Sequence, residues 1–234
     1  MTDSLPHVAV PPASRREERS TDYAYRKLKS LILDSEFAPG AFLLEKDAAA
    51  QLGLSRTPVR EALVRLEQDG LLEIVPRHGA RISALSPADM RDIYEVLTSL
   101  EPTAAELLAR RRPSAGELAD LSEACAAMER ALNAPDLKAW ATADEAFHRN
   151  LAARCGNRRL SDMIMTVWDQ SHRARMFTLS LRPLPVQSTR EHRAILDAIL
   201  AGESNAAREL YRAHRRRGGA ELMSIIETHG FNRL

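Results

Sequence analysis

The stretch Leu54-Ser-Arg-Thr-Pro-Val-Arg-Glu-Ala-Leu-Val-Arg-Leu66 decides how the first part of the chain folds. Proline is favoured in the first turn of a helix, so Pro58 predicts a helix that starts near Thr57. Apolar side chains then recur at the spacing of a helix with one buried face, namely at Val59, Ala62, Leu63 and Leu66. The opposite, polar face is left with three arginines.

The polar face of this helix has the residue types that read a DNA groove. A helix-turn-helix motif places the N-terminal end of its second helix in the major groove, and here that end has Arg56, Thr57 and Arg60. An arginine fork can bond guanine O6 and N7 together, so we expect the two arginines to contact bases and Thr57 the backbone. Arg65, further along, is expected to contact a phosphate. Two arginines four residues apart more often mark a solvated helix face, and only the neighbouring elements favour DNA.

Those neighbouring elements complete a winged unit. Thr21 can cap a helix over 22–35, and a second short helix over 45–52 ends at Gly53. After the central helix the apolar period changes, which predicts a hairpin over 71–83. The tip of this hairpin, where a wing reaches the adjacent groove or backbone, consists of Arg77, His78 and Gly79.

Charge and composition limit the class of protein. The 234 residues include 33 Lys and Arg against 32 Asp and Glu, a balance that argues against indiscriminate polyanion binding. No apolar run is long enough for a spanning helix, and the N-terminal stretch has no apolar segment of a secretory signal. Two cysteines cannot build a disulfide framework. We therefore expect a cytoplasmic protein with no membrane partner.

The remainder of the chain has only helical patterns. We expect a mainly α protein with an N-terminal winged helix-turn-helix domain and an all-α C-terminal helical bundle. The predicted organisation is a mobile tail over 1–20, a DNA-binding domain over 21–84 and an effector-binding and dimerisation domain over 85–234. The helices predicted for the bundle run over about 88–111, then from after Ser114 to at least Leu132, and over about 137–154, 160–181, 188–200 and 204–228.

Three histidines stand on the apolar faces of separate predicted helices. His192 and His214 have apolar neighbours one helical turn away, and Asp144 shares a face with His148. One inward histidine is usually a hydrogen-bonded core residue. Three buried histidines and a carboxylate would each need a hydrogen-bond partner of their own. One shared metal would instead serve as the partner of all four. The predicted cofactor is a divalent transition metal (Zn, Ni, Fe or Mn, with zinc favoured).

Residues 22–83 resemble the winged helix-turn-helix domain of the GntR family of bacterial transcription regulators. The resemblance lies in Leu-Gly-Leu-Ser-Arg-Thr-Pro-Val-Arg-Glu-Ala-Leu over 52–63, Leu-Glu-Gln-Asp-Gly-Leu over 66–71 and Pro-Arg-His-Gly over 76–79. It implies operator contacts by Arg56 and Arg60, a phosphate contact near Lys46, and wing contacts through His78 and Gly79.

The second half resembles the FCD effector domain of the FadR subfamily. The resemblance lies in Asp144-Glu-Ala-Phe-His148, Glu191-His192-Arg-Ala-Ile195 and His214. It implies that Asp144 and the three histidines bind a metal, and six helices resemble the VanR-like branch. One departure is Leu97, where the family commonly has an arginine that helps to shape the site.

Another residue must supply the positive charge of the missing arginine in the effector site, and the helix over 160–181 offers one. Arg175 is the candidate, with Ser171 on the same face, and a solvent-facing Arg175 is equally compatible with the sequence. The run over 215–217 is interpreted as a solvated face.

Together these patterns predict a ligand-responsive transcription regulator, expected to be a repressor, and not an enzyme. A homodimer would read a near-palindromic double-stranded operator, and a small organic acid would bind the metal-containing pocket. Three alternatives stay open: a direct metal sensor, a structural metal beside an apolar ligand, and, less favoured because no separate general base is evident, a metal-dependent enzyme.

Overall fold

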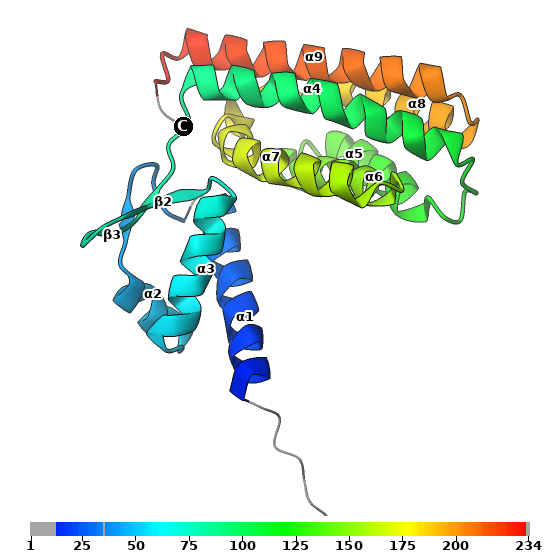
Figure 1. Cartoon of the computed structure of the whole chain (residues 1–234). Coiled ribbons are helices and arrows are strands. Elements are labelled where there is room, and N and C mark those ends of the chain that lie inside the picture. Colours follow the sequence, from blue (N-terminus) through cyan, green and yellow to red (C-terminus); the bar gives the residue numbers. More distant parts are fainter. Residues whose placement is uncertain (1–12, 35, 233–234) are drawn as a thin grey trace, which may run out of the picture. The chain divides into compact units, whose positions relative to one another are not determined.

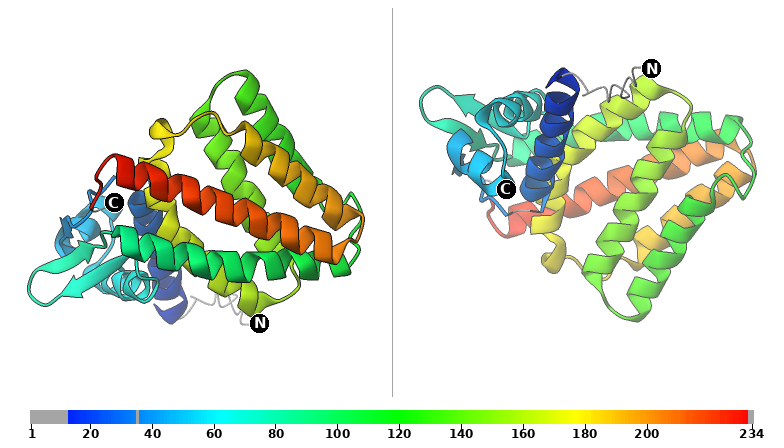
Figure 2. Two further views of the ribbon diagram at one scale, coloured as in Figure 1. Left: turned by 90° about the horizontal axis from the view of Figure 1, so that it is seen from above. Right: turned by 90° about the horizontal axis from the view of Figure 1, so that it is seen from below.

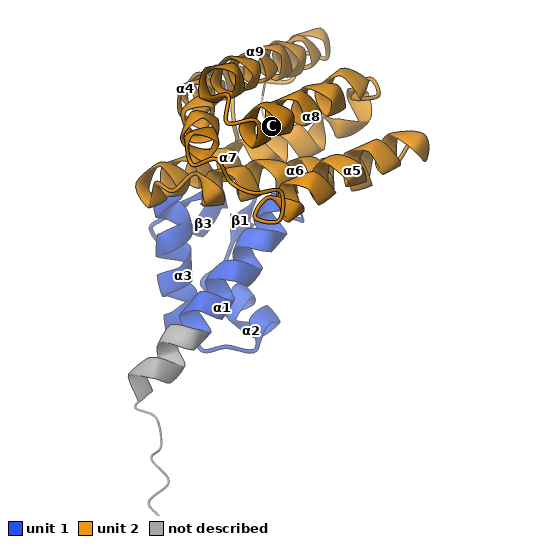
Figure 3. Cartoon of the chain, turned by 90° about the vertical axis from the view of Figure 1, so that its right-hand side faces the viewer, with its two compact units in different colours: residues 1–83 blue, residues 84–234 orange. Residues whose placement is uncertain are grey.

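The computed structural model describes residues 13–34 and 36–232. The chain divides into two compact units, and the division falls between Ser83 and Ala84 (Figure 3). Both units are built mainly from helices. None of the helices in the described part of the chain is long and apolar enough to cross a membrane.

The first unit combines three helices with a small antiparallel sheet of strand order β1-β3-β2 (Figure 1). The hairpin of β2 and β3 is the predicted wing, with Ile74 opposite Ala80. The elements are α1 (Ala13–Leu33), β1 (Phe42–Leu43), α2 (Glu45–Leu52), α3 (Arg56–Gln68), β2 (Leu72–Val75) and β3 (Gly79–Ile82).

The apolar face of α3 holds this unit together, as its sequence predicts. Val59 and Leu66 are fully buried and belong to one core cluster with Leu28 and Ile32 of α1. Because this face is used for packing, the opposite face with Arg56 and Arg60 stays exposed.

Helix α1 begins at Ala13, nine residues before the predicted start at Asp22. Residues 13–20 of the predicted tail are therefore helical, and residues 1–12 lie outside the described part of the chain. Thr21 is buried inside the helix and does not cap it. Its hydroxyl donates a hydrogen bond to Glu61 Oε2 at 2.7 Å, which ties α1 to α3.

Strand β1 was not predicted, because two residues give no alternating pattern. It pairs with β3 beside Gly79, whose φ of +93° lies in the left-handed region. A Cβ atom at this position would lie 2.6 Å from the carbonyl oxygen of Leu43. Gly79 is thus required by the wing's own backbone packing, independently of any role in binding DNA.

The second unit is a bundle in which α4 packs along α9, α5 against α6, and α8 against α9 (Figure 2). Its helices confirm the six predicted ones to within a few residues, and a short 3₁₀ helix, η1, follows α7. The elements are α4 (Pro87–Arg110), α5 (Ala119–Asn133), α6 (Leu137–Arg154), α7 (Arg158–Phe177), η1 (Leu179–Leu181), α8 (Val186–Leu200) and α9 (Ser204–Thr228).

Two adjacent glycines in α9 are expected to respond oppositely to alanine. A Cβ atom on Gly219 would lie 2.8 Å from Cδ1 of the nearly buried Tyr94 on α4, so Gly219→Ala must displace that ring. We expect Gly219→Ala to lower the free energy of unfolding by about 1–3 kcal/mol. A Cβ atom on Gly218 meets nothing within 4 Å, so Gly218→Ala should raise the free energy by about 0.5–1 kcal/mol.

Urea denaturation of the two variants measures this difference. Each variant controls for the other, because both add one methyl group to the same turn of the same helix. Equal effects of the two substitutions would show that Tyr94 adjusts to the methyl group without cost.

Candidate functional site

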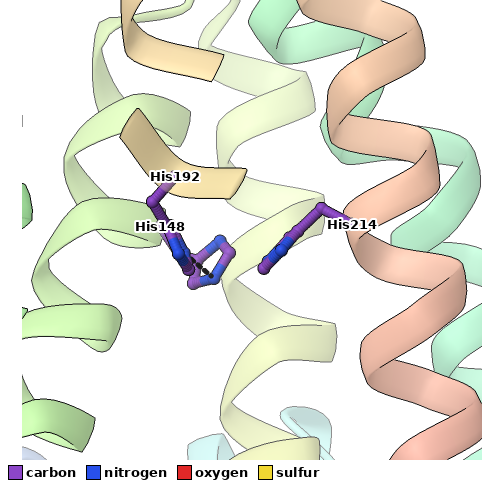
Figure 4. A group of neighbouring side chains, drawn as sticks. All are labelled: His148, His192 and His214. Atoms are coloured by element: carbon purple, nitrogen blue, oxygen red, sulfur yellow. Dashed lines mark hydrogen bonds between the residues drawn. The ribbon is translucent and has the colours of Figure 1, made fainter. Parts of the chain in front are cut away.

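Three buried histidines from three helices meet inside the second unit. His148 lies on α6, His192 on α8 and His214 on α9 (Figure 4). One ring nitrogen from each lies within 4.8 Å of the others. Residues distant in the sequence are thereby brought together as the histidine pattern predicts.

Asp144 completes the group from one turn earlier on α6. Its Oδ1 lies 3.5 Å from His148 Nε2 and 3.3 Å from His192 Nε2. The two Nε2 atoms are 3.2 Å apart, and the dashed line in Figure 4 marks this contact. The four predicted ligands therefore share one small volume.

Hydrogen bonds at the other ring nitrogens set how two of the imidazoles are oriented. His192 Nδ1 donates to the carbonyl oxygen of Ser188 at 2.7 Å, and His214 Nδ1 donates to Glu191 Oε2 at 2.8 Å. A carbonyl and a carboxylate only accept, so each of these rings has its proton on Nδ1. Neutral His192 and His214 are left with lone pairs on Nε2, the arrangement found in metal-ligating histidines.

His148 is held by a buried polar network behind the cluster. Its Nδ1 lies 2.6 Å from the Tyr211 hydroxyl and 3.0 Å from Arg215 Nη2. Tyr211 donates to Glu101 Oε1 at 3.3 Å, and Arg215 makes a two-pronged ion pair with the same carboxylate. Glu101 thus accepts from two groups that contact His148, which fixes this ring from behind.

The electrostatics keep the imidazoles neutral and the carboxylate ionised. Burial lowers the pKa of His192 to about 3 and lowers the pKa values of His148 and His214 as well. Burial alone raises the pKa of Asp144, but the Arg175 guanidinium and the nearby imidazoles outweigh it and hold that pKa well below its usual range. A metal binds neutral imidazoles and ionised carboxylates, and these four groups are in those states at neutral pH.

This donor set fits a divalent transition metal. Three neutral imidazoles and one carboxylate are the ligand types that zinc and its neighbours in the periodic table prefer. Arg215 can only donate to His148 Nδ1, so in the absence of a metal His148 Nε2 donates its proton to His192 Nε2 at 3.2 Å, and a metal would replace that proton. The residues therefore suit a metal, and they do not select which one.

A cavity opens beside the histidines. The cavity has a volume of about 30 Å³, and its lining includes His148, His214 and Asp144. Arg175 also lines it, pairs through Nη2 with Asp144 Oδ2, and lies over the Trp168 ring at 4.6 Å. Of the two sequence-based orientations, the structure shows Arg175 turned inward.

Ser171 is not brought to this cavity. Its side chain is fully buried, and its hydroxyl donates to the carbonyl oxygen of Trp168 at 2.8 Å within the same helix. The periodicity that grouped Ser171 with Arg175 is correct about the inward face. It does not distinguish a residue that lines the cavity from one that is covered by its neighbours.

Arg215 corrects the prediction of a solvated face over 215–217. Its side chain is 4% exposed and pairs with Glu101, whose side chain is 1% exposed. Leu97 is fully buried in an apolar cluster with Trp168.

The residues that sequence reasoning missed are Glu101, Tyr211, Arg215 and Glu191. A signal existed for one of them. Glu101 falls in the inward stripe of α4 that also contains Ile93, Leu97 and Leu108, and a carboxylate on such a stripe needs a buried partner.

Four of the predicted DNA-contacting side chains lie exposed near the starts of α2 and α3. Lys46 lies in the first turn of α2, and Arg56, Thr57 and Arg60 lie in the first five residues of α3; all four are exposed. Glu45 accepts two hydrogen bonds from Arg60, at 2.8 and 3.1 Å, and its Oε1 lies 3.5 Å from Arg56 Nε. Both arginines expected to read bases thus share one carboxylate.

The other predicted contacts differ in their surroundings. Arg65 pairs with Asp22 at 2.7 Å and stacks over the Tyr25 ring at 4.2 Å, so it is engaged within the protein. Arg77, with φ of +66°, and His78 lie at the exposed tip of the wing, next to Gly79. His78 Nδ1 is 3.0 Å from the carbonyl oxygen of Pro76.

Removing the charge of Glu45 should loosen the specificity of DNA binding. Glu45→Gln frees Arg56 and Arg60 from an ion pair and removes a negative charge beside them. Exposed pairs of this kind contribute up to about 1 kcal/mol, so we expect affinity for a scrambled duplex to rise by roughly two- to fivefold. Fluorescence anisotropy at several salt concentrations would measure it.

Asp47→Asn is the matched control for that experiment. Asp47 lies on the same first turn of α2 and makes no ion pair within 4.0 Å among the residues that the structure describes. If both substitutions raise the affinity for the scrambled duplex equally, the effect comes from the change in net charge. The ion pairs of Glu45 with Arg56 and Arg60 then do not restrain DNA binding.

Comparisons with known proteins agree with this division of the chain. The gntR family of bacterial regulatory proteins matches residues 21–82, and the FCD domain matches residues 92–217. An HTH-type transcriptional regulator from the TAR-I ttuE-ttuC' intergenic region of Agrobacterium vitis is 48% identical over 132 residues, which are 56% of this chain and 77% of that protein. The HTH-type transcriptional repressor GlaR of Escherichia coli is 29% identical, with 81% and 90% covered.

A solved structure, E. coli McbR/YncC, has the same fold. Its TM-score is 0.77 at 23% identity, and the likeness covers 88% of this chain and 97% of the other. A winged helix-turn-helix unit followed by this helical bundle defines a transcription regulator and not an enzyme. The chain belongs to the gntR family of bacterial regulatory proteins, with an FCD domain as its second part, and it fits the FadR subfamily.

Proposed function

We propose that this regulator represses transcription from a near-palindromic operator and that a small organic acid bound in a metal-containing pocket controls it. The observation that carries the proposal is the convergence of Asp144, His148, His192 and His214 beside a cavity lined by Arg175. Homologues named as repressors support the direction of control.

Within this proposal, two copies of the chain present two recognition helices to the two half-sites. Arg56 and Arg60 contact base edges, and Thr57 contacts the backbone. Phosphates and the adjacent groove are contacted by Lys46, Arg77, His78 and Gly79, and Arg65 reaches a phosphate only if it leaves its ion pair with Asp22.

Asp144 and the three histidines would hold the metal. When bound, the metal supplies a Lewis-acidic centre with open positions that can take a carboxylate oxygen. Arg175 orients Asp144 through one side of its guanidinium and offers Nη1 to the ligand. Ligand binding would change operator affinity only as far as the ligand prefers one arrangement of the protein over another.

Operator binding by the zinc-loaded full chain, titrated with a panel of organic acids, tests this proposal. The operator would first be selected from randomised duplexes. We expect some carboxylates to lower operator affinity at least fivefold, the lower end of ordinary coupling between sites. No shift across the panel contradicts effector control.

A direct metal sensor is the second candidate, because the ligand cluster alone would serve it. Zinc titration of operator binding without any organic acid separates the two. A change of affinity with zinc alone favours the metal sensor, and a change only with the acid favours the effector pocket.

A further inference from the structure

A second cation, Arg182, lines the same cavity and lacks an anionic partner. It directly follows η1 in the sequence. Its Nη2 donates weakly to Thr178 Oγ1 at 3.4 Å, and its buried Nε has no hydrogen-bond partner among the described residues. Among the residues that the structure describes, no carboxylate oxygen lies within 4.0 Å of the Arg182 guanidinium.

Arg175 also has an unsatisfied guanidinium nitrogen, although one of its other nitrogens pairs with a carboxylate. Its side chain is 11% exposed, its Nη2 is used by Asp144, and its buried Nη1 has no partner in the described residues. Burial lowers the pKa of Arg182, and the more distant carboxylates of Glu221 and Asp144 offset this only in part. Buried donors without acceptors are costly, so each of these two unsatisfied N–H groups favours an incoming acceptor.

The charge of the cavity indicates how many negative groups that anion needs. The four arginines on the cavity wall are Arg175, Arg182, Arg215 and Arg217. Four carboxylates lie on that wall or behind it as their partners, namely Asp144, Glu221, Glu101 and Glu191. The cavity is therefore balanced without a metal, and a divalent ion leaves a surplus of two positive charges.

We propose that the effector is a small dicarboxylate, with one carboxylate directed to the metal and the other held by Arg182 together with Arg175. This inference rests on the proposed effector pocket and adds to it the second anionic subsite. A dianion neutralises the surplus, and its second carboxylate supplies the acceptor that Arg182 lacks. A monocarboxylate would leave Arg182 uncompensated.

Isothermal titration of the zinc-loaded full chain with matched acids tests the proposal. The probes are malonate, succinate and glutarate, with butyrate as the monoanion of the same chain length as succinate. We expect the dicarboxylate that fits to bind about tenfold or more tightly than butyrate, the value of one charge-assisted hydrogen-bonded subsite. Arg182→Gln should remove about tenfold from dicarboxylate affinity and leave butyrate affinity unchanged.

Two accompanying measurements exclude a structural effect of the substitution. Zinc content of Arg182→Gln should stay at the wild-type value, and its midpoint in urea should be unchanged or higher, because an uncompensated buried cation has been removed. Arg158→Gln, at a side chain that is 94% exposed, is the control and should bind every acid as wild type does.

The outcomes separate the two levels of the proposal. Equal affinities for butyrate and all three dicarboxylates, or an equal loss of both in Arg182→Gln, overturn the dicarboxylate assignment while the metal-containing pocket stands. Zinc-loaded protein that binds no acid at all overturns the effector pocket, and the dicarboxylate assignment with it.

Discussion

Arg60→Ala should reduce affinity for the selected operator at least a hundredfold and affect a scrambled duplex far less. Arg60 is 67% exposed at the start of α3, where its fork is free to turn from Glu45 to a base edge. One bidentate contact to guanine contributes about 1–3 kcal/mol of discrimination, and a dimer on two half-sites would lose it twice. Electrophoretic mobility shifts at fixed salt would measure both affinities.

The substitution should not affect folding, because Arg60 contributes nothing to the core of the first unit. Arg158→Ala makes the same change of charge on the exposed end of α7 and should leave operator binding intact. If Arg60→Ala binds the operator as tightly as Arg158→Ala does, the polar face of α3 is not the surface that reads DNA.

The comparison of Arg60 with Arg65 shows what the sequence can and cannot predict about this surface. Both stand on the polar face of one helix, and periodicity separates that face correctly from the buried Val59 and Leu66. Periodicity cannot reveal that Arg65 is paired with Asp22, 43 positions earlier in the chain. That pair depends on where α1 lies, and α1 itself starts nine residues before its predicted start.

In the candidate metal site, too, the sequence predicts which residues are buried but not which distant charges pair. Asp144 and the three histidines were predictable because each stands among apolar residues at helical spacing. Arg215 was not, because the charges beside it in the sequence resemble a solvated face, while its partner Glu101 lies 114 positions away. Local pattern indicates which face is buried, and only the fold shows which buried charges meet.

His148→Ala combined with His192→Ala should reduce bound zinc from about one per chain to almost none. The pair removes two of the three imidazoles, including both Nε2 atoms beside Asp144 Oδ1, and leaves only His214 and one carboxylate. Structural sites normally need four ligands and catalytic ones at least three, so two cannot retain the ion through dialysis. Metal analysis of purified protein after dialysis measures the content directly.

The thermal midpoint gives a second, independent readout of the same loss. A ligand present at a thousand times its dissociation constant stabilises the folded state by about 4 kcal/mol, so zinc should raise the midpoint of the wild-type protein and leave that of the double variant unchanged. His172→Ala is the matched control, since His172 is a buried histidine of α7 whose Nδ1 faces Glu145 and which is not part of the cluster. His172→Ala should keep both its zinc and its zinc-dependent shift. Full zinc occupancy in the double variant would place the ion elsewhere and leave the three histidines as a hydrogen-bonded core.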